Sequence, residues 1–418
     1  MSNIGPKKSA FMIFAPEAAS TKDKGVRIQW RGTPIPRVEA YTVRYLGVML
    51  HENCRWDCHL AHAREKGAKA TYAMASVLHN RRIHLAVRRI VLQACVRPVV
   101  EYASTVWHGT QADMKRLEQV QYRVLKRMAA THENVAAALL NMEFGCRTYE
   151  SWAMQRKLEF QFRLSRMPGN RLPAMVSRCK WNGLTGAKKP GMHAAQVQRI
   201  SELVNLNPSQ QATDPEISYA MFKKRAAMAV RRSDLCKLTS CSKSTVRKYL
   251  QAHSHMDAFP NKMQPYLDGT MSAGMRTKLL FKAGFAPVQH LHARKHETAA
   301  GDQSDPSCPF CTCRDETAAH FALECPQFTE YRTAMREALS EQVGEHAFAE
   351  WDALQADEKL AALLNDHRWG KAATGVDYIA QHYLSDIVRE RVARLPTTHC
   401  THPAGTAGAR AHGSTCYG

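Results

Sequence analysis

The stretch CPFCTCRDETAAHFALEC, residues 308–325, contains the spacing of a four-ligand zinc site. Cys308 and Cys311 form a Cys-x-x-Cys pair, and His320 and Cys325 follow with four residues between them. Zinc takes tetrahedral thiolate and imidazole ligands, and a tight Cys-x-x-Cys turn supplies two of them. We expect the second pair to share one face of a short helix that ends at Pro326.

Coincidence is the competing explanation, because the chain contains 13 cysteines. The order Cys, Cys, His, Cys at these gaps favours zinc. Cys313 is close enough in sequence to compete as a ligand. We leave it out because a Cys-x-Cys pair needs a tighter and less usual loop.

The bulk composition is that of a globular protein. The 418 residues are 44% hydrophobic and 23% charged, enough for two or three domains with real cores. No apolar run reaches the length of a membrane span, and no signal peptide is visible, so we expect no membrane partner. The odd number of scattered cysteines favours a reducing intracellular compartment over a disulfide framework.

The positive charge is concentrated in the first 300 residues. These contain 48 Lys and Arg against 20 Asp and Glu, a net of +28, whereas residues 301–418 contain 10 against 17, a net of −7. A basic body of this size indicates a polyanionic partner, and nucleic acid is the first candidate. The alternative is a surface that is merely basic and solvated.

The pattern along the chain predicts a small β segment followed by helices. Residues 26–38 read as a hairpin with a turn at 31–33, and residues 41–50 alternate like a strand in which Gly47 marks a bulge or a close backbone approach. Helices are expected at 62–80, 83–107, 111–130, 134–142 and 149–166. Pro98 should kink or break the second of these. In the third, Met114, Leu117, Val120, Val124 and Leu125 form an apolar stripe.

The remaining residues are expected to be helical between irregular segments. Residues 235–250 read as two helices around a turn at 239–241; an ordinary helical hairpin is a better interpretation than a DNA-recognition helix. The tail holds His399, Cys400, His402, His412 and Cys416, but its Gly-rich composition favours a flexible end over a second metal site. Trp107, Trp152, Phe160 and Phe162 are expected to pack in a core rather than to stack on bases.

Six blocks, in this order, resemble the C-terminal half of reverse transcriptases from non-LTR (LINE-type) retrotransposons. They are KSAFMIF (8–14), YLGVML (45–50), RWDCH (55–59), VRPVVEYASTVW (96–107), LEQVQYRVLKR (117–127) and the Cys-Cys-His-Cys block up to Pro326. The first five cover roughly residues 7–130. Each block alone is weak, and the order and spacing together make the resemblance specific.

The resemblance implies roles for individual residues. Lys8 matches a lysine that lies near the incoming nucleotide, and Tyr45, Leu46 and Gly47 match the hairpin that borders the primer end. The helices that follow resemble the thumb, which tracks the template–primer duplex. The zinc block matches a knuckle that helps to hold RNA or DNA. We therefore assign nucleic-acid binding to the three hairpin residues and to these basic residues: Lys66, Lys69, Arg116, Arg123, Lys126 and Arg127.

The chain departs from this family at the catalytic centre. Polymerisation needs carboxylates that hold two metal ions, and the family carries one Asp-Asp pair for this purpose, whereas this chain has no Asp-Asp pair. We therefore expect no catalytic residues here, with Lys8 only a possible neighbour of the nucleotide. Zn²⁺ is the expected structural cofactor, and Mg²⁺ would bind only if an upstream catalytic palm completed the site.

The expected fold is mainly α, with a small N-terminal β remnant of a reverse-transcriptase palm, a helical thumb-like domain and a C-terminal zinc knuckle with helices. The expected segments are a palm remnant (1–58), a basic thumb-like domain (59–168), a linker (169–200), a basic helical region (201–300), the zinc knuckle (301–330), C-terminal helices (331–395) and a flexible tail (396–418).

The expected function is a truncated reverse transcriptase that binds RNA, an RNA–DNA hybrid or DNA and that does not polymerise alone. The alternatives are a non-enzymatic, zinc-containing nucleic-acid-binding protein derived from a retroelement, and a relic without function. A nuclear location is implied by the resemblance alone.

Overall fold

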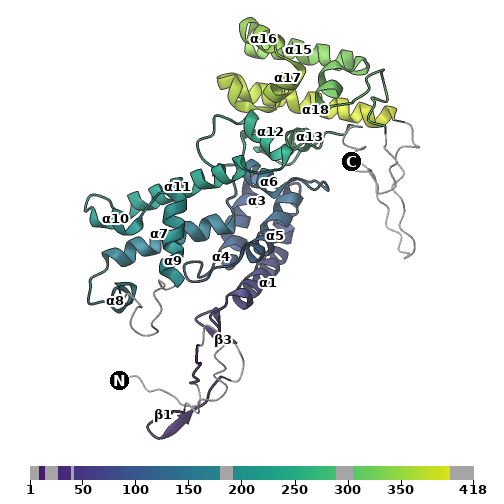
Figure 1. The fold of residues 1–418 in the computed structure, drawn as a ribbon. Coiled ribbons are helices and arrows are strands. Elements are labelled where there is room, and N and C mark those ends of the chain that lie inside the picture. The colour runs from purple at the N-terminus through teal and green to yellow at the C-terminus, as the bar shows by residue number, and fades with distance from the viewer. Residues whose placement is uncertain (1–8, 15–26, 39–41, 179–191, 289–304, 396–418) are drawn as a thin grey trace, which may run out of the picture. The chain divides into compact units, whose positions relative to one another are not determined.

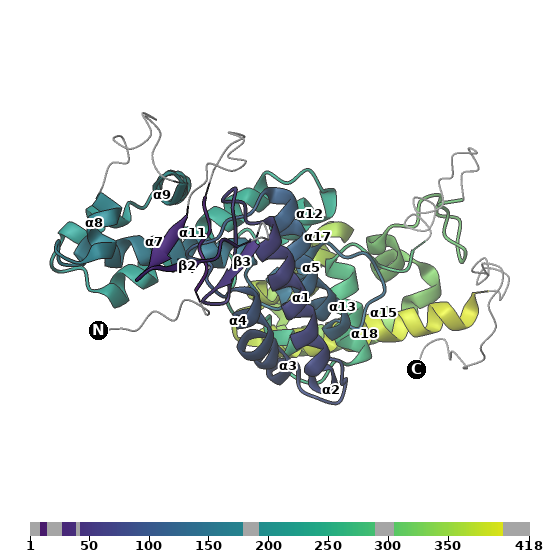
Figure 2. The same ribbon diagram turned by 90° about the horizontal axis from the view of Figure 1, so that it is seen from below.

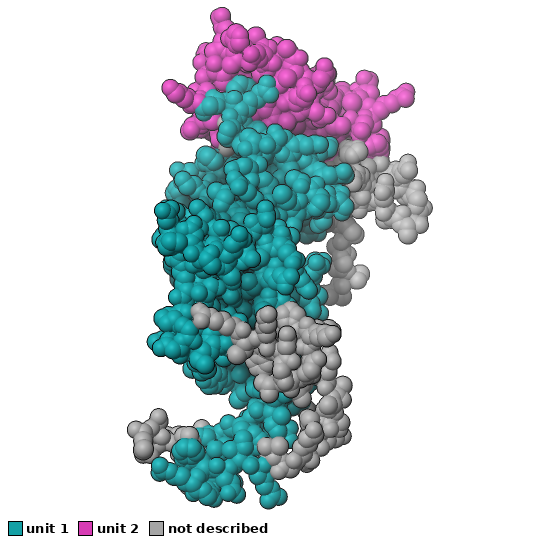
Figure 3. All heavy atoms as spheres, turned by 60° about the vertical axis from the view of Figure 1, so that its left-hand side comes forward, with its two compact units in different colours: residues 1–285, 365–370 teal, residues 286–364, 371–418 magenta. Residues whose placement is uncertain are grey.

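The structure, a computed structural model, describes residues 9–14, 27–38, 42–178, 192–288 and 305–395. It is mainly helical, as expected, with two small antiparallel hairpins near the N-terminus (Figures 1 and 2). The chain divides into two compact units, coloured separately in Figure 3. Unit 1 comprises residues 1–285 and 365–370, and unit 2 comprises residues 286–364 and 371–418.

Unit 1 begins with four short strands and continues with helices. The strands are β1 (Ile28–Trp30), β2 (Thr33–Ile35), β3 (Thr42–Tyr45) and β4 (Val48–His51). The first helices are α1 (Asp57–Ala73), α2 (Ala75–Leu78), α3 (Leu85–Val91), η2 (Leu92–Val96), α4 (Arg97–Val100), α5 (Gln111–Met128), α6 (Ala137–Glu143), α7 (Tyr149–Arg166) and α8 (Leu172–Arg178). They are followed by α9 (Met192–Val204), α10 (Pro208–Thr213), α11 (Tyr219–Thr239), α12 (Ser244–Ala252), η4 (Pro265–Leu267) and α13 (Ala273–Lys282).

The helices of the C-terminal part begin within the zinc stretch. They are η5 (His320–Glu324), η6 (Pro326–Phe328), α15 (Thr329–Val343), α16 (Glu345–Asp352), α17 (Ala356–Leu364), η7 (Asp366–Ala372) and α18 (Ala373–Arg394). In unit 2, α15 packs against α16 and α18, and α17 packs against α18.

Both hairpins turn on two residues in the left-handed region of backbone space. The β1–β2 hairpin, which was predicted, turns at Arg31 and Gly32. The expectation of one alternating strand over 41–50 is wrong, because Tyr45 pairs with Val48 and the chain reverses at Leu46 (φ 47°) and Gly47 (φ 82°). Two consecutive positive φ angles match the twist of a hairpin, which favours glycine at the second position.

The core of unit 1 forms where α1 packs against α4 and α5. A methyl group added to Gly67 would lie 2.4 Å from Val100 Cγ2 and 3.3 Å from Val120 Cγ1, so this glycine lets the three helices approach closely. The apolar stripe of α5 is confirmed, since its five predicted members are buried. Thr110 begins α5 with a reciprocal capping box to Asp113, which fixes the start of the helix.

Pro98 interrupts the helix expected at 83–107 without ending it. The five residues before Arg97 form the π-helical turn η2, between α3 and α4. Proline has no N–H to donate and its ring collides with the preceding turn, and a wider π turn accommodates both effects.

Most of the described residues in the expected linker, 169–200, are helical. It contains α8 and the first residues of α9, whereas residues 179–191 lie outside the described residues. α9 packs on α7 and α11, and these two helices contact each other through Phe162 and Phe222, whose ring centroids are 4.2 Å apart. Pro173 is the second residue of α8, where its missing N–H costs no helical hydrogen bond, and α9 contains neither Gly nor Pro. The finer boundaries of the seven segments remain predictions.

A buried polar network joins α12, η4 and α13 to Glu143 at the end of α6. Glu143 is 2% exposed and accepts hydrogen bonds from the hydroxyls of Tyr249 and Tyr266, each at 2.6 Å. Lys282 completes the network with an ion pair to Glu143 at 2.9 Å. Because the carboxylate is fully paired, its burial is tolerated.

The turn predicted between two helices near residue 240 is confirmed, since α11 ends at Thr239 and α12 begins at Ser244.

Candidate metal centre and basic surface

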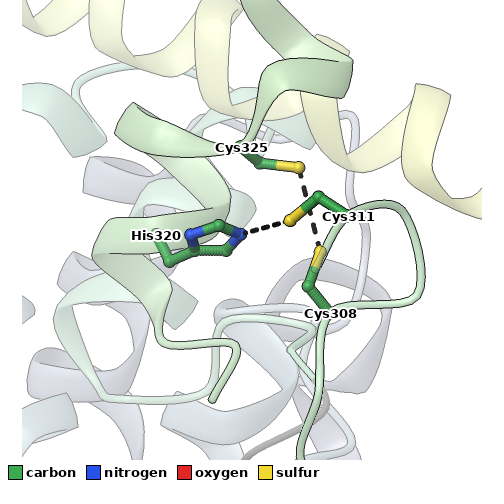
Figure 4. Close-up of side chains that lie close together, drawn as sticks. All are labelled: Cys308, Cys311, His320 and Cys325. Carbon is green, nitrogen blue, oxygen red and sulfur yellow. Dashed lines mark hydrogen bonds between the residues drawn. The ribbon is translucent and has the colours of Figure 1, made fainter. Parts of the chain in front are cut away.

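The four predicted zinc ligands of unit 2 meet at one point. Their ligand atoms all lie within 4.8 Å of one another (Figure 4). Cys308 Sγ is 3.8 Å from Cys325 Sγ, and Cys311 Sγ is 3.3 Å from His320 Nε2. Tetrahedral zinc with Zn–S of about 2.3 Å and Zn–N of about 2.0–2.1 Å places its ligand atoms about 3.5–3.8 Å apart. The cluster can therefore hold a zinc ion with little rearrangement.

His320 and Cys325 are brought together by a π turn rather than an α-helical turn. They are five positions apart, which on an α-helix would put them on different faces. The turn η5 is π-helical, and the Cys325 N–H donates to the His320 carbonyl at 2.8 Å. The expected short α-helix is therefore a π turn. His320 and Cys325 nevertheless lie on the same face, as predicted.

The first pair of ligands is held by a compact loop. The Cys308 N–H donates to the Cys313 carbonyl at 2.9 Å, which closes the loop around Cys311. The Cys313 thiol is directed elsewhere, since it donates to the Asp315 carbonyl at 3.4 Å. Cys313 is not among the clustered residues, as expected.

The metal centre is built on the core of unit 2. Glu316 and Arg391 form a buried two-pronged ion pair beside it, in which Arg391 Nη2 donates to Glu316 Oε2 at 2.7 Å. The Arg391 guanidinium also lies 5.0 Å from the ring centroid of Phe321. The Tyr383 hydroxyl donates to the Ala322 carbonyl within η5. These contacts fix the ligand-bearing turn to α18.

Burial shapes the electrostatics of the centre. Cys325 is fully buried and Cys308 nearly so, and burial raises the pKa of both thiols. A metal ion opposes this effect because it binds the thiolate. The Glu324 carboxylate lies 3.7 Å from His320 Nδ1, where it can orient the imidazole as outer carboxylates do at zinc sites.

The hairpin residues assigned to nucleic-acid binding stand at an exposed tip. Tyr45 and Leu46 are 63% and 73% exposed. A Cβ added to Gly47 would lie 3.0 Å from the ring of Tyr102, whose hydroxyl donates to the Leu46 carbonyl at 2.8 Å. The predicted close approach at Gly47 is therefore present, and Tyr102, which the sequence did not single out, holds the turn in place.

The predicted basic residues on α1 and at the start of α5 differ in their exposure and in their ion pairs. Lys69 is exposed and pairs with Glu65 at 2.7 Å. Arg116 is exposed with a loose contact of 3.8 Å to Asp113. Lys66 is half-buried and makes no hydrogen bond or ion pair to another described residue. Exposed ion pairs are weak, so Lys69 and Arg116 remain available to bind a ligand.

Arg123, Lys126 and Arg127 meet at the end of α5. They line a pocket of about 420 Å³ together with His79, Arg81, Ala130, Thr131 and His132. We call this the basic pocket. The sequence did not point to His79, Arg81 or His132, because they come from the turns after α2 and α5. The charged pair Arg81-Arg82 was the only local signal.

The prediction that four aromatic residues pack in a core is confirmed for Trp107 and Phe162, whereas Trp152 and Phe160 are half-buried. Trp107 and Phe162 are each 1% exposed, so both are packing residues. Trp152 is partly exposed and lies 5.2 Å under the Arg156 guanidinium. Lys8 and the five His and Cys residues of the tail lie outside the described residues.

The chain matches no family model, no curated protein and no solved structure. No helix in the described ranges has the length and apolarity to cross a membrane.

Proposed function

We propose that this chain is a nucleic-acid-binding segment of a non-LTR retrotransposon reverse transcriptase, which holds RNA, an RNA–DNA template–primer or DNA. The basic helices of unit 1 bind the phosphate backbone, and the tip of the β3–β4 hairpin borders the primer end. The block order that resembles this family motivates the proposal.

The excess of unpaired cations on α1 and α5 is the observation that carries the proposal. Arg64, Lys115 and Arg123 are exposed and make no hydrogen bond or ion pair to any residue in the described ranges. The nearby Glu118 is turned inward, where it accepts the Tyr149 N–H at 2.5 Å. A surface with free cations and few carboxylates attracts a polyanion, since phosphate contacts supply most non-specific affinity.

The zinc ion has a structural role in this proposal. Four protein ligands leave no open coordination position for a substrate, as in structural rather than catalytic zinc sites. Because the ligands belong to a loop and to the π turn η5, the ion would join both segments to the core of unit 2.

The chain does not polymerise by itself in this proposal, because no Asp-Asp pair is present to hold catalytic metal ions. The purified chain should incorporate no labelled deoxynucleotide on a primed RNA template with Mg²⁺. Incorporation above that of a no-protein control would contradict this part of the proposal.

Binding is tested with the zinc-loaded chain and fluorescent nucleic acids. A primed RNA–DNA duplex should bind more tightly than unprimed single strands, and unlabelled duplexes of unrelated sequence should compete equally. Strong preference for one sequence would instead favour a retroelement-derived regulator. Absence of binding at low salt would exclude both functions.

A further inference from the structure

The basic pocket of unit 1 is lined by cations without a balancing carboxylate. Three arginines and one lysine reach it from two segments, and no Asp or Glu is among the lining residues in the part of the chain that the structure describes. Its volume of about 420 Å³ lies within the range of small-ligand sites, roughly 300–1,000 Å³. Like charges that converge on one cavity repel each other unless an anion lies between them.

Few of these cations are engaged by the protein. Arg81 and Arg123 are exposed and have no hydrogen-bond or ion-pair partner in the part of the chain that the structure describes. Lys126 Nζ contacts only the Asn134 amide oxygen, at 3.3 Å. Arg127 Nη1 lies 2.9 Å from His79 Nε2, a neutral partner that orients the guanidinium without cancelling its charge.

A fifth cation lies behind the pocket. Arg88 is fully buried and donates to the Leu78 carbonyl at 2.9 Å and to the Arg127 carbonyl at 3.4 Å. These carbonyls end α2 and α5, where a helix terminus would normally repel an anion. Arg88 engages them, and its Nη1 has no hydrogen-bond partner. Burial lowers the pKa of Arg88 only to about 10, so it stays charged at neutral pH.

We propose that the basic pocket is a phosphate-binding site that holds one phosphate group of a bound nucleic-acid strand. The inference rests on the proposed function and adds to it a fixed contact point. Arg123 and Lys126 bind the phosphate oxygens directly, Arg127 is positioned by His79, and Arg88 offsets the helix ends behind them. A specific phosphate-binding site differs from a diffuse basic surface because it fixes the position of the nucleic-acid strand on the protein.

The test compares two double variants that each remove two positive charges from unit 1. Arg123→Gln with Lys126→Gln changes the basic pocket. Lys223→Gln with Lys224→Gln is the matched control, because both lysines are exposed on α11 and neither is among the buried residues of that helix. Circular dichroism and thermal melting verify that each variant is folded. Affinity for a labelled primed RNA–DNA duplex is measured by anisotropy across a salt series.

The pocket variant should lose about tenfold in affinity at low salt, and its salt slope should fall by about one. The control should lose less than about threefold, as expected for screened surface charge. Pyrophosphate should displace the duplex from the wild type better than sulfate at equal ionic strength, and the pocket variant should lack this difference.

Three results would overturn the inference in different ways. Equal losses in both variants would mean a diffuse basic surface, while the proposed function would stand. Loss of pyrophosphate binding with unchanged duplex affinity would mean that the pocket takes a free phosphate compound. If the wild type binds no nucleic acid at all, the proposed function itself fails.

Discussion

The backbone N–H of Cys325 donates to the carbonyl of His320 at 2.8 Å, which makes the segment between these two ligands a π turn. The turn compensates for a spacing one residue too long for an α-helix. π turns occur often at functional sites, and this one puts an imidazole and a thiol on the same side. The zinc site thus depends on backbone geometry as well as on ligand identity.

Substitution of a clustered cysteine should remove one zinc equivalent per chain, whereas substitution of Cys313 should not. Cys308→Ser and Cys325→Ser each delete a ligand atom, while the Cys313 thiol contacts the Asp315 carbonyl outside the cluster. Elemental analysis after dialysis measures the zinc content. Loss of zinc in Cys313→Ser, or its retention in both ligand variants, would contradict the assigned ligand set.

Breaking the buried ion pair beside the metal centre should destabilise unit 2 strongly. In Glu316→Ala, the Arg391 charge stays buried without its partner, at a cost of about 3–5 kcal/mol. Hydrogen exchange of α15 and α18 in the zinc-loaded chain measures the loss. The control Arg389→Ala breaks an exposed pair with Asp386 on the same helix and should have little effect. Similar exchange in both variants would show that the buried pair is unimportant.

Leu46→Asn should separate folding from binding at the hairpin tip. Leu46 has a φ of 47°, which asparagine tolerates well, and Asn-Gly is a favoured turn sequence, so folding should be unharmed. The variant removes a largely exposed apolar side chain, and duplex affinity should fall by about tenfold, roughly 1.4 kcal/mol. Leu172→Asn, at a similarly exposed position of α8, is the control. Unchanged affinity in Leu46→Asn would limit Leu46 to a structural role.

Lys157 should make stability rise with pH in the alkaline range. Its ammonium donates to the Trp107 carbonyl at 2.8 Å, and burial lowers its pKa from 10.5 to about 8. Between these two values the unfolded chain binds more protons than the folded chain, so the free energy of unfolding increases as the pH rises.

Comparison with Lys157→Met isolates this effect. Urea unfolding should show the wild type gaining on the order of 2–3 kcal/mol over the variant between neutral pH and about pH 10.5. Curves that stay parallel across this window would mean that Lys157 is charged in the fold throughout.

The sequence predicted those elements that depend on residues close together in the chain. The stripe of α5 follows from apolar residues at helical spacing, and the zinc ligands follow from their gaps in sequence. The π turn was missed because the same four-residue gap between His320 and Cys325 fits a helix loosely, and only packing against Tyr383 and α18 shows which turn forms. Gly47 was placed within a strand because alternation continues on both sides of the turn.

Features built from distant segments were not predictable from the sequence. The basic pocket unites the ends of α2 and α5, and the buried Arg88 that supports it lies among apolar residues of α3. The helices α8 and α9 were missed because Gly and Pro were counted over the whole range 169–200, whereas α9 contains neither and Pro173 stands in the first turn of α8. For the basic pocket and Arg88, contacts between distant segments decide the outcome.

The most direct test of the account is the affinity of the zinc-loaded chain for a primed RNA–DNA duplex as a function of salt. We predict tight binding at low salt, a steep loss of affinity as salt increases, and a preference for the primed duplex over single strands. No binding at low salt, or binding that is insensitive to salt, would contradict the account, because its cationic surface would then have no polyanion to hold.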